Sequence, residues 1–249
     1  ENKKKINNLK KKFKYLNIKM IISRKKNQVY QRILGFKKSK NKIIMQLDDD
    51  VRVKRNCIET LYKFISKKSK IAVAPKYEFY RKSKLSKIYL KPKVFYLKIY
   101  HWILNSSKGF SPGTISLSGF NYQDESKSFG YREHDWLSGG IIMHKKKNLI
   151  LKNYYPFGFS RSVSEDIIHS LELRKNGVKL IKLYDAKVSA DLSTGIVERK
   201  SFKKTICYFI SKFRITFYIV AKYKMSVTRF LIEYVIFFFR VLVSFLRRK

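Results

Sequence analysis

The sequence is poor in acidic residues. It has 17 Asp and Glu against 57 Lys and Arg in 249 residues, which gives a formal net charge of +40. A balance this basic indicates anionic partners, such as nucleic acid, membrane headgroups or phosphorylated substrates, and carries no information about fold. Lys accounts for 43 of the basic residues and Arg for 14, whereas specific readout of bases and phosphates favours Arg. We therefore interpret the Lys excess as compositional background, and we expect no nucleic-acid partner.

Cysteine is also scarce. Cys57 and Cys207 are far apart and form no CxxC spacing, so the sequence indicates neither a zinc site nor a disulfide framework, and a reducing compartment is expected. The 45% hydrophobic and 15% aromatic content excludes wholesale disorder. No signal peptide or internal repeat is recognisable. Because the chain starts at Glu1 without Met, we expect a fragment or a trimmed sequence.

The chain also lacks a long uninterrupted hydrophobic run. Residues 201–223 and 226–246 are two expected helices rich in Phe, Ile and Val, but Glu233 and Arg240 interrupt the second one, which is short for a membrane span. An interfacial helix followed by basic residues fits this pattern better. We therefore expect two parts, a larger domain in residues 1–197 and a membrane-associated helical pair in residues 198–249.

The first part alternates strand-like and helix-like segments, which is typical of an α/β architecture. Expected strands lie at residues 18–22, 43–47, 71–74, 141–144, 178–183 and 187–190. Expected helices lie at residues 28–38, 56–66 and 165–176, and the stretch at 93–104 is a further helix candidate. The pattern predicts a mixed, mainly parallel sheet flanked by helices, with a C-terminal amphipathic helical pair.

The few acids are clustered. No carboxylate occurs between Asn2 and Leu47, and then Asp48, Asp49 and Asp50 follow directly after an apolar strand candidate. Open α/β sheets bind ligands beyond their strand ends, and grouped carboxylates suit Mg²⁺ or Mn²⁺. The alternative is a turn in which basic neighbours neutralise the acids, and for this motif alone the two interpretations are equally good.

Two further motifs follow later in the chain. Glu165 and Asp166 open a helix, where acids are favoured by the helix dipole with Ser164 as N-cap, but where a carboxylate could also serve as a general base. The segment WLSGG (136–140) joins an indole to two glycines, which suits either a turn before a core strand or a sugar pocket. The four histidines show no ligand spacing, and we interpret them as structural.

The order of these motifs resembles the family 2 glycosyltransferases, which have the GT-A fold. The resemblance covers about residues 18–195 and rests mainly on QRILGFKKSKNKIIMQLDDDV and on the ED-helix-Gly-strand block. The family's first nucleotide-binding strands have no counterpart in this sequence, so the resemblance implies an N-terminally truncated domain.

The resemblance implies a role for each acid. Asp48 and Asp50 would contact the metal, Mg²⁺ or Mn²⁺, and the donor diphosphate. Asp49 would also belong to the donor site, adjoining the nucleotide ribose or the metal. Asp166 would be the catalytic base, with Glu165 next to it.

The resemblance also implies a pocket and a further metal ligand. The sugar and acceptor pocket would be formed by Trp136, Ser138, Gly139 and Gly140. Asp191 stands where the family often has a metal-binding His and is a further candidate ligand.

The implied function is metal-dependent, inverting transfer of a sugar from a nucleotide-sugar donor. The acceptor would be a cell-surface glycan or a lipid-linked molecule at the cytoplasmic face of the cell membrane, to which the protein would bind peripherally or through its C-terminus. Two alternatives remain open at this point: a basic nucleic-acid-binding protein, and a catalytically inactive glycosyltransferase fragment.

Overall fold

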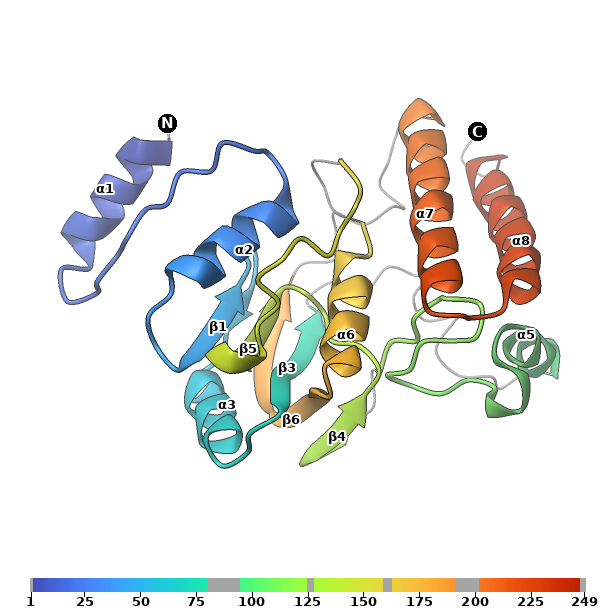
Figure 1. Cartoon of the computed structure of the whole chain (residues 1–249). Coiled ribbons are helices and arrows are strands. Elements are labelled where there is room, and N and C mark those ends of the chain that lie inside the picture. Colours follow the sequence, from blue (N-terminus) through green and yellow to red (C-terminus); the bar gives the residue numbers. More distant parts are fainter. Residues whose placement is uncertain (1, 80–94, 125–127, 159–162, 191–201, 247–249) are drawn as a thin grey trace.

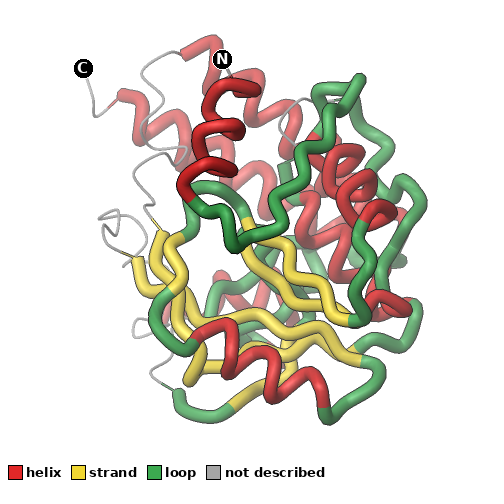
Figure 2. The backbone as a smooth tube through the Cα atoms, turned by 90° about the vertical axis from the view of Figure 1, so that its left-hand side faces the viewer, coloured by secondary structure: helices red, strands yellow, loops and turns green. Residues whose placement is uncertain are grey.

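A computed structural model describes residues 2–79, 95–124, 128–158, 163–190 and 202–246 of the chain (Figure 1). It is a mixed α/β structure in which helices lie on both sides of one sheet (Figure 2). This confirms the expected α/β class. In chain order the elements are α1 (Asn2–Lys12), α2 (Gln28–Lys38), β1 (Ile43–Leu47), β2 (Arg52–Val53), α3 (Cys57–Ser66), β3 (Ile71–Phe79), α5 (Phe95–Asn105), η1 (Ser106–Lys108), β4 (Tyr131–His134), β5 (Ile141–Lys145), η2 (Lys146–Asn148), α6 (Glu165–Lys175), β6 (Lys179–Ala190), α7 (Phe202–Lys222) and α8 (Val227–Leu246).

The strand order is β1-β5-β3-β6-β2, with β4 also paired to β6. Among the described strands only β3 and β6 run parallel, and the other four pairings are antiparallel. The sheet is therefore mixed, as expected, but not mainly parallel. Parallel neighbours need a crossover connection, usually a helix, whereas β5 follows β4 without a helix between them and runs antiparallel to both β1 and β3.

β6 is one long strand, where the sequence predicted two short ones. It pairs with β3 from Ile71 opposite Lys179 to Pro75 opposite Leu183, and again from Lys76 opposite Lys187 onward. The three residues 184–186 have no partner in β3, so they form a bulge on β6. Bulges bend a strand and redirect its side chains, and this one lies at the site described below.

Alternate side chains of β3 pack into two separate hydrophobic cores, one on each face of the sheet. Ile71 and Val73 of β3 pack with Leu61 and Ile65 of α3 on one face of the sheet. Ala72 and Ala74 face the opposite core with α2, α6 and α7. This two-residue period is what a strand buried on both faces requires.

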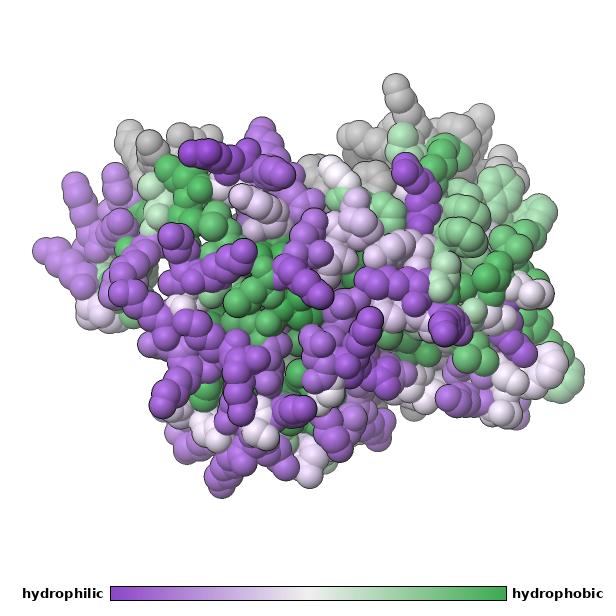
Figure 3. All heavy atoms as spheres, viewed as in Figure 1, coloured by the Kyte–Doolittle hydropathy of each residue, from purple (hydrophilic) through white to green (hydrophobic). Residues whose placement is uncertain are grey.

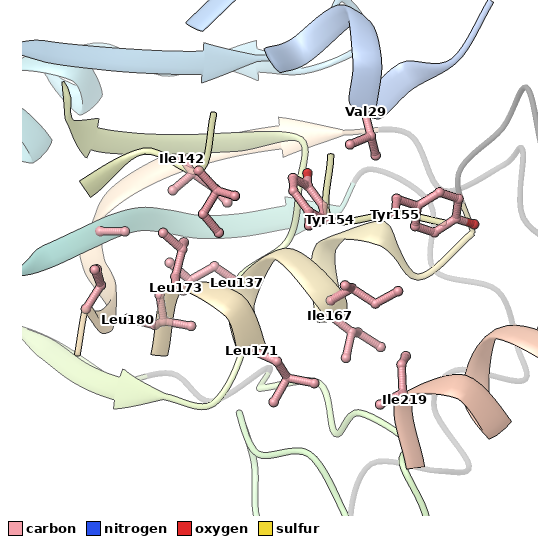
Figure 4. Close-up of a cluster of buried hydrophobic side chains, with 14 of the residues drawn as sticks. Val29, Leu137, Ile142, Tyr154, Tyr155, Ile167, Leu171, Leu173, Leu180 and Ile219 are labelled. Carbon is pink, nitrogen blue, oxygen red and sulfur yellow. The ribbon is translucent and has the colours of Figure 1, made fainter. Parts of the chain in front are cut away.

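The second core holds α6 against the sheet. Leu173 of α6 lies beside Leu137 and Leu180, while Ile167 and Leu171 lie on the part of the cluster nearer to Ile219 of α7 (Figure 4). Because α7 contributes buried side chains to the same core as the sheet, it packs as part of the α/β layers. The expected division at residue 197 remains a prediction.

Residues 18–22 do not form a strand, which corrects the sequence expectation. They have no strand pairing, and Ile21 and Ile22 are 44% and 65% exposed. An apolar run forms a strand only where a sheet edge is available to pair with it, and here β1 pairs with β5 instead. The helix α1 before this run was not expected from the sequence.

The helices α5, α7 and α8 lie together at one end of the molecule, with α7 and α8 side by side (Figure 1). Hydrophobic surface gathers over this end in the space-filling view (Figure 3). Within the described residues, no helix has both the length and the apolarity needed to cross a membrane.

Candidate active site

The Asp48 to Asp50 loop follows directly from β1 and lies against the glycine pair of the WLSGG segment. The backbone N–H of Asp48 donates a hydrogen bond to the carbonyl of Gly140 at 2.8 Å, and the Gln46 side-chain amide donates to the carbonyl of Gly139. Asp48 is half-buried, whereas Asp49 and Asp50 are exposed. Two of the motifs that the sequence singled out therefore meet at the end of β1.

A cavity of about 300 Å³ opens at this point. Five of the predicted site residues line it: Asp48, Asp50, Trp136, Ser138 and Gly140. The remaining wall comes from β3, β4 and β6, from Val51 and Leu137, and from the segment before β4. The other predicted site residues in the described part of the chain, Asp49, Gly139, Glu165 and Asp166, are not among the lining residues. The structure thus gathers predicted metal-site and sugar-pocket residues around one cavity.

The two glycines of the WLSGG segment have no room for a side chain. A Cβ at Gly139 would lie 2.5 Å from Glu165 Oε1 and 3.4 Å from the Cβ of Asp166, and a Cβ at Gly140 would overlap the Tyr77 hydroxyl. Close backbone approach of this kind requires glycine. The segment therefore packs directly against the start of α6, which carries Glu165 and Asp166.

Trp136 forms part of the cavity wall. Its ring is 5% exposed and its Nε1–H donates to the carbonyl of Tyr122 at 3.2 Å. The next residue, Leu137, donates its backbone N–H to the hydroxyl of Ser170 on α6 at 3.0 Å. These two bonds fix the orientation of the indole, and Ser138 beside it faces the cavity.

Arg32 connects the two acid segments, and the sequence analysis did not single it out. It projects from α2, and its Nη1 lies 2.5 Å from Glu165 Oε2 while its Nη2 lies 3.7 Å from Asp48 Oδ1. The Tyr154 hydroxyl donates to the same Glu165 oxygen at 3.3 Å. Burial alone would lower the pKa of Arg32, but the ion pair with Glu165 raises it above its ordinary value. Arg32 therefore stays charged between the two acids.

The carboxyls of Asp48 and Asp166 are less acidic than usual. Burial raises the pKa of Asp48 to about 6, with Arg32 opposing the shift and the neighbouring acids adding to it. Burial and Glu165 raise the pKa of Asp166, and Lys212 and Arg32 oppose that shift. A general base works best when its pKa lies near the working pH, so the direction of this shift is compatible with the role that the resemblance implies for Asp166.

A third acid borders the cavity on the far side. The buried Asp124 carboxylate accepts a hydrogen bond from the Tyr184 hydroxyl and lies 3.2 Å from His134 Nε2. Asp124, His134 and Lys182 all line the cavity. The sequence analysis interpreted His134 as structural, because the histidines show no ligand spacing. Its partner Tyr184 is 50 positions away on the β6 bulge, so no local pattern could reveal this contact.

The donor set fits a hard divalent cation of the kind that the resemblance implies. Asp48 and Asp50 face the same cavity, and Mg²⁺ is commonly bound by one or two carboxylates and completed by substrate phosphates. No cluster of three or more His, Cys, Asp or Glu with the spacing of a metal site occurs in the part of the chain that the structure describes. Asp191, the third predicted ligand, lies outside the described residues.

Comparison with known proteins agrees with the motifs. Residues 3–120, just under half of the chain, match the model of glycosyl transferase family 2. The matched segment includes β1 and Asp48 to Asp50 and ends before the Trp136 and Glu165 segments. The chain thus resembles the family 2 glycosyltransferases, as the sequence predicted. A search of curated proteins gave no match.

Solved structures give a more distant likeness. One match is the crystal structure of GalNAc-T7 with UDP, GalNAc and Mn²⁺, with 16% identity and a TM-score of 0.46. The likeness covers 68% of this chain but 31% of that chain. The present chain therefore spans about a third of the length of that solved protein.

Proposed function

We propose that this chain, a family 2-like glycosyltransferase, moves a sugar from a nucleotide-sugar donor to an acceptor hydroxyl in the cavity beside Asp48 and Asp50. The observation that carries this proposal is the Arg32 bridge. Arg32 pairs with Asp48, which lines the cavity, and with Glu165 at the start of α6, and so links the two acid segments. Chance acid clusters in a Lys-rich chain would have no reason to converge in this way.

Asp48 and Asp50 would hold Mg²⁺ or Mn²⁺ and, through it, the donor diphosphate. When bound, the cation would offset negative charge on the departing nucleoside diphosphate. The two carboxylates are suited to this because both face the cavity and because burial and then the repulsion of the adjacent acids disfavour the charged form of Asp48, and a bound cation would offset that repulsion. Clustered acids of this kind are relieved by a cation.

Asp166 would accept the proton of the acceptor hydroxyl. It lies in the first turn of α6, which is fixed by core packing, and beside Gly139, the neighbour of Gly140 in the cavity wall. Glu165 is less suited to this role, because Arg32 and Tyr154 already hold one of its oxygens. One base acting in a single displacement at the anomeric carbon gives inversion.

The acceptor end of the reaction would lie at an anionic membrane surface. Six apolar side chains on one side of α8 are between 41% and 58% exposed: Leu231, Ile232, Val235, Phe238, Phe239 and Val243. Their three- and four-residue spacing forms an apolar stripe on a helix too polar to span a bilayer. With a net charge of +40, attachment to the cytoplasmic face and a glycan or lipid-linked acceptor follow as part of the proposal.

Donor binding tests the enzymatic proposal. Calorimetry with UDP-, GDP- and dTDP-sugars should show binding of one nucleotide class with Mn²⁺ and loss of that binding after chelation. Binding of RNA or DNA that falls steeply with salt and is insensitive to chelation, with no nucleotide sugar bound, would favour the nucleic-acid alternative instead.

Vesicle sedimentation tests the membrane part. The chain should bind vesicles that contain anionic phosphatidylglycerol more strongly than phosphatidylcholine vesicles, and Val235→Glu should weaken this binding. Leu151→Glu is a matched control, because Leu151 is also exposed but lies outside α8. Equal binding of both variants would refute docking through α8.

A further inference from the structure

Lys212 on α7 contacts the start of α6. Its Nζ donates a hydrogen bond to the hydroxyl of Ser164 at 2.6 Å. Ser164 directly precedes Glu165 and Asp166, the first two residues of α6. A side chain from the C-terminal helical pair therefore reaches the turn that carries the proposed base.

Ser164 needs this support. It occupies the N-cap position that the sequence predicted, but its side chain makes no capping bond to the helix. Its φ of 53° is in the left-handed region, which is unfavourable for a residue other than glycine and persists only where the surroundings hold it. Instead of capping the helix, the Ser164 hydroxyl accepts the hydrogen bond from Lys212, and this bond holds the Ser164 side chain in place.

Lys212 also faces the charge of Asp166. Four titratable or charged groups act on or respond to this carboxyl: Glu165 beside it raises its pKa, Lys212 and Arg32 lower it, and Tyr77 of β3 is itself affected by it. Burial lowers the pKa of Lys212 to about 8, and Asp166 opposes that shift. Lys212 is half-buried, and an ammonium withdrawn from water is costly unless it is paired, so its location calls for an explanation beyond packing.

We propose that Lys212 is a positioning residue for the reaction. It holds the turn at Ser164 and supplies positive charge to Asp166, and α7 thereby becomes part of the catalytic site. This inference rests on the proposed function, in which Asp166 is the base.

The test compares Lys212→Met with Lys222→Met in the full chain. Lys222 lies on the same helix and also pairs with α6, through Glu172 at 2.7 Å, but near the far end of α6. In Lys212→Met the acidic limb of the kcat/KM profile should move to higher pH, because Asp166 loses a positive neighbour and becomes protonated more easily. At a pH on that limb kcat should fall about tenfold, while KM for the donor stays unchanged. Lys222→Met should keep the wild-type limb.

Two further variants separate charge from position. Lys212→Arg keeps the charge and should restore the wild-type limb. Ser164→Ala removes the hydrogen-bond acceptor but keeps the lysine, so kcat should fall while the limb stays in place. If Lys212→Met and Lys222→Met give the same limb and the same kcat, Lys212 is merely structural and the inference is wrong.

A readout without turnover keeps the inference testable even if the proposed function fails. The pKa of Asp166, measured by carboxyl ¹³C NMR titration, should rise in Lys212→Met and stay unchanged in Lys222→Met. Absence of any nucleotide-sugar turnover in the wild type would refute the proposed function. An unchanged Asp166 pKa in Lys212→Met would refute the role of Lys212, whatever the activity. Should Lys212→Met fail to fold, Lys212→Gln serves in the same titration.

Discussion

The two acid segments of this chain differ in how their negative charge is balanced. At the start of α6, Glu165 is buried and held by Arg32 and Tyr154, and Asp166 faces Lys212. In the loop after β1, Arg32 stands 3.7 Å from Asp48, while Asp49 and Asp50 are exposed. The first segment is fixed by the protein's own cations, and the second retains charge that a ligand can neutralise. One segment is thus suited to proton transfer and the other to binding.

Replacing the proposed base should have the largest effect. Asp166→Asn keeps the shape of the side chain but removes the proton acceptor, so turnover should fall about 10²–10⁴-fold. Donor binding measured by calorimetry should be retained. Glu172→Gln on the same helix is the control and should keep full turnover. Unchanged turnover in Asp166→Asn would remove the catalytic assignment from the α6 segment.

Replacing Arg32, the side chain that pairs with both acid segments, should mainly lower the stability of the fold. Arg32→Met leaves Glu165 buried without its ion pair, and breaking a buried pair in this way costs about 3–5 kcal/mol. Urea unfolding followed by circular dichroism measures this loss. Lys63→Met breaks the exposed pair with Glu59 and should change the midpoint little. Equal midpoints for the two variants would show that the Arg32 bridge does not hold the site together.

The loop after β1 should respond in binding more than in stability. Asp50→Ala removes an exposed carboxylate at the cavity, so the chain should unfold as the wild type does. Mn²⁺-dependent donor binding should weaken about 10–100-fold, as expected for the loss of a charged contact. Glu59→Ala, another exposed acid, provides the control. If both variants bind the donor like the wild type, the loop is an ordinary solvated turn.

The smallest effect is expected at Tyr154. Tyr154→Phe removes one hydrogen bond to Glu165 and leaves the Arg32 pair in place, so the free energy of unfolding should fall by about 1 kcal/mol. The same urea experiment measures it. A loss as large as that of Arg32→Met would mean that Glu165 depends on the tyrosine rather than on the ion pair.

Local pattern was enough to predict where the acids fall. β1 is a short apolar run that ends at Asp48, and Gly177 follows α6 in the left-handed conformation expected of a C-terminal cap. Such signals lie within a few residues of each other, so they can be recognised in one sequence.

The partners of those acids could not be predicted in this way. Arg32 and Glu165 are 133 positions apart, and Lys212 and Ser164 are 48 apart. Which of 57 basic residues meets which acid depends on how α2, α6 and α7 pack on the sheet. β2 and β4 were missed for a different reason, since strands of two and four residues have too little periodicity to stand out.

The bulge on β6 separates two stretches of regular pairing with β3. Tyr184, within the bulge, reaches the cavity wall at Asp124, while the ladders on either side keep their own registers. A change in the length of this three-residue segment would alter the shape of the cavity wall without shifting either ladder. It is therefore the place where evolution, or an engineer, could adjust the width of the cavity while leaving the rest of the sheet as it is.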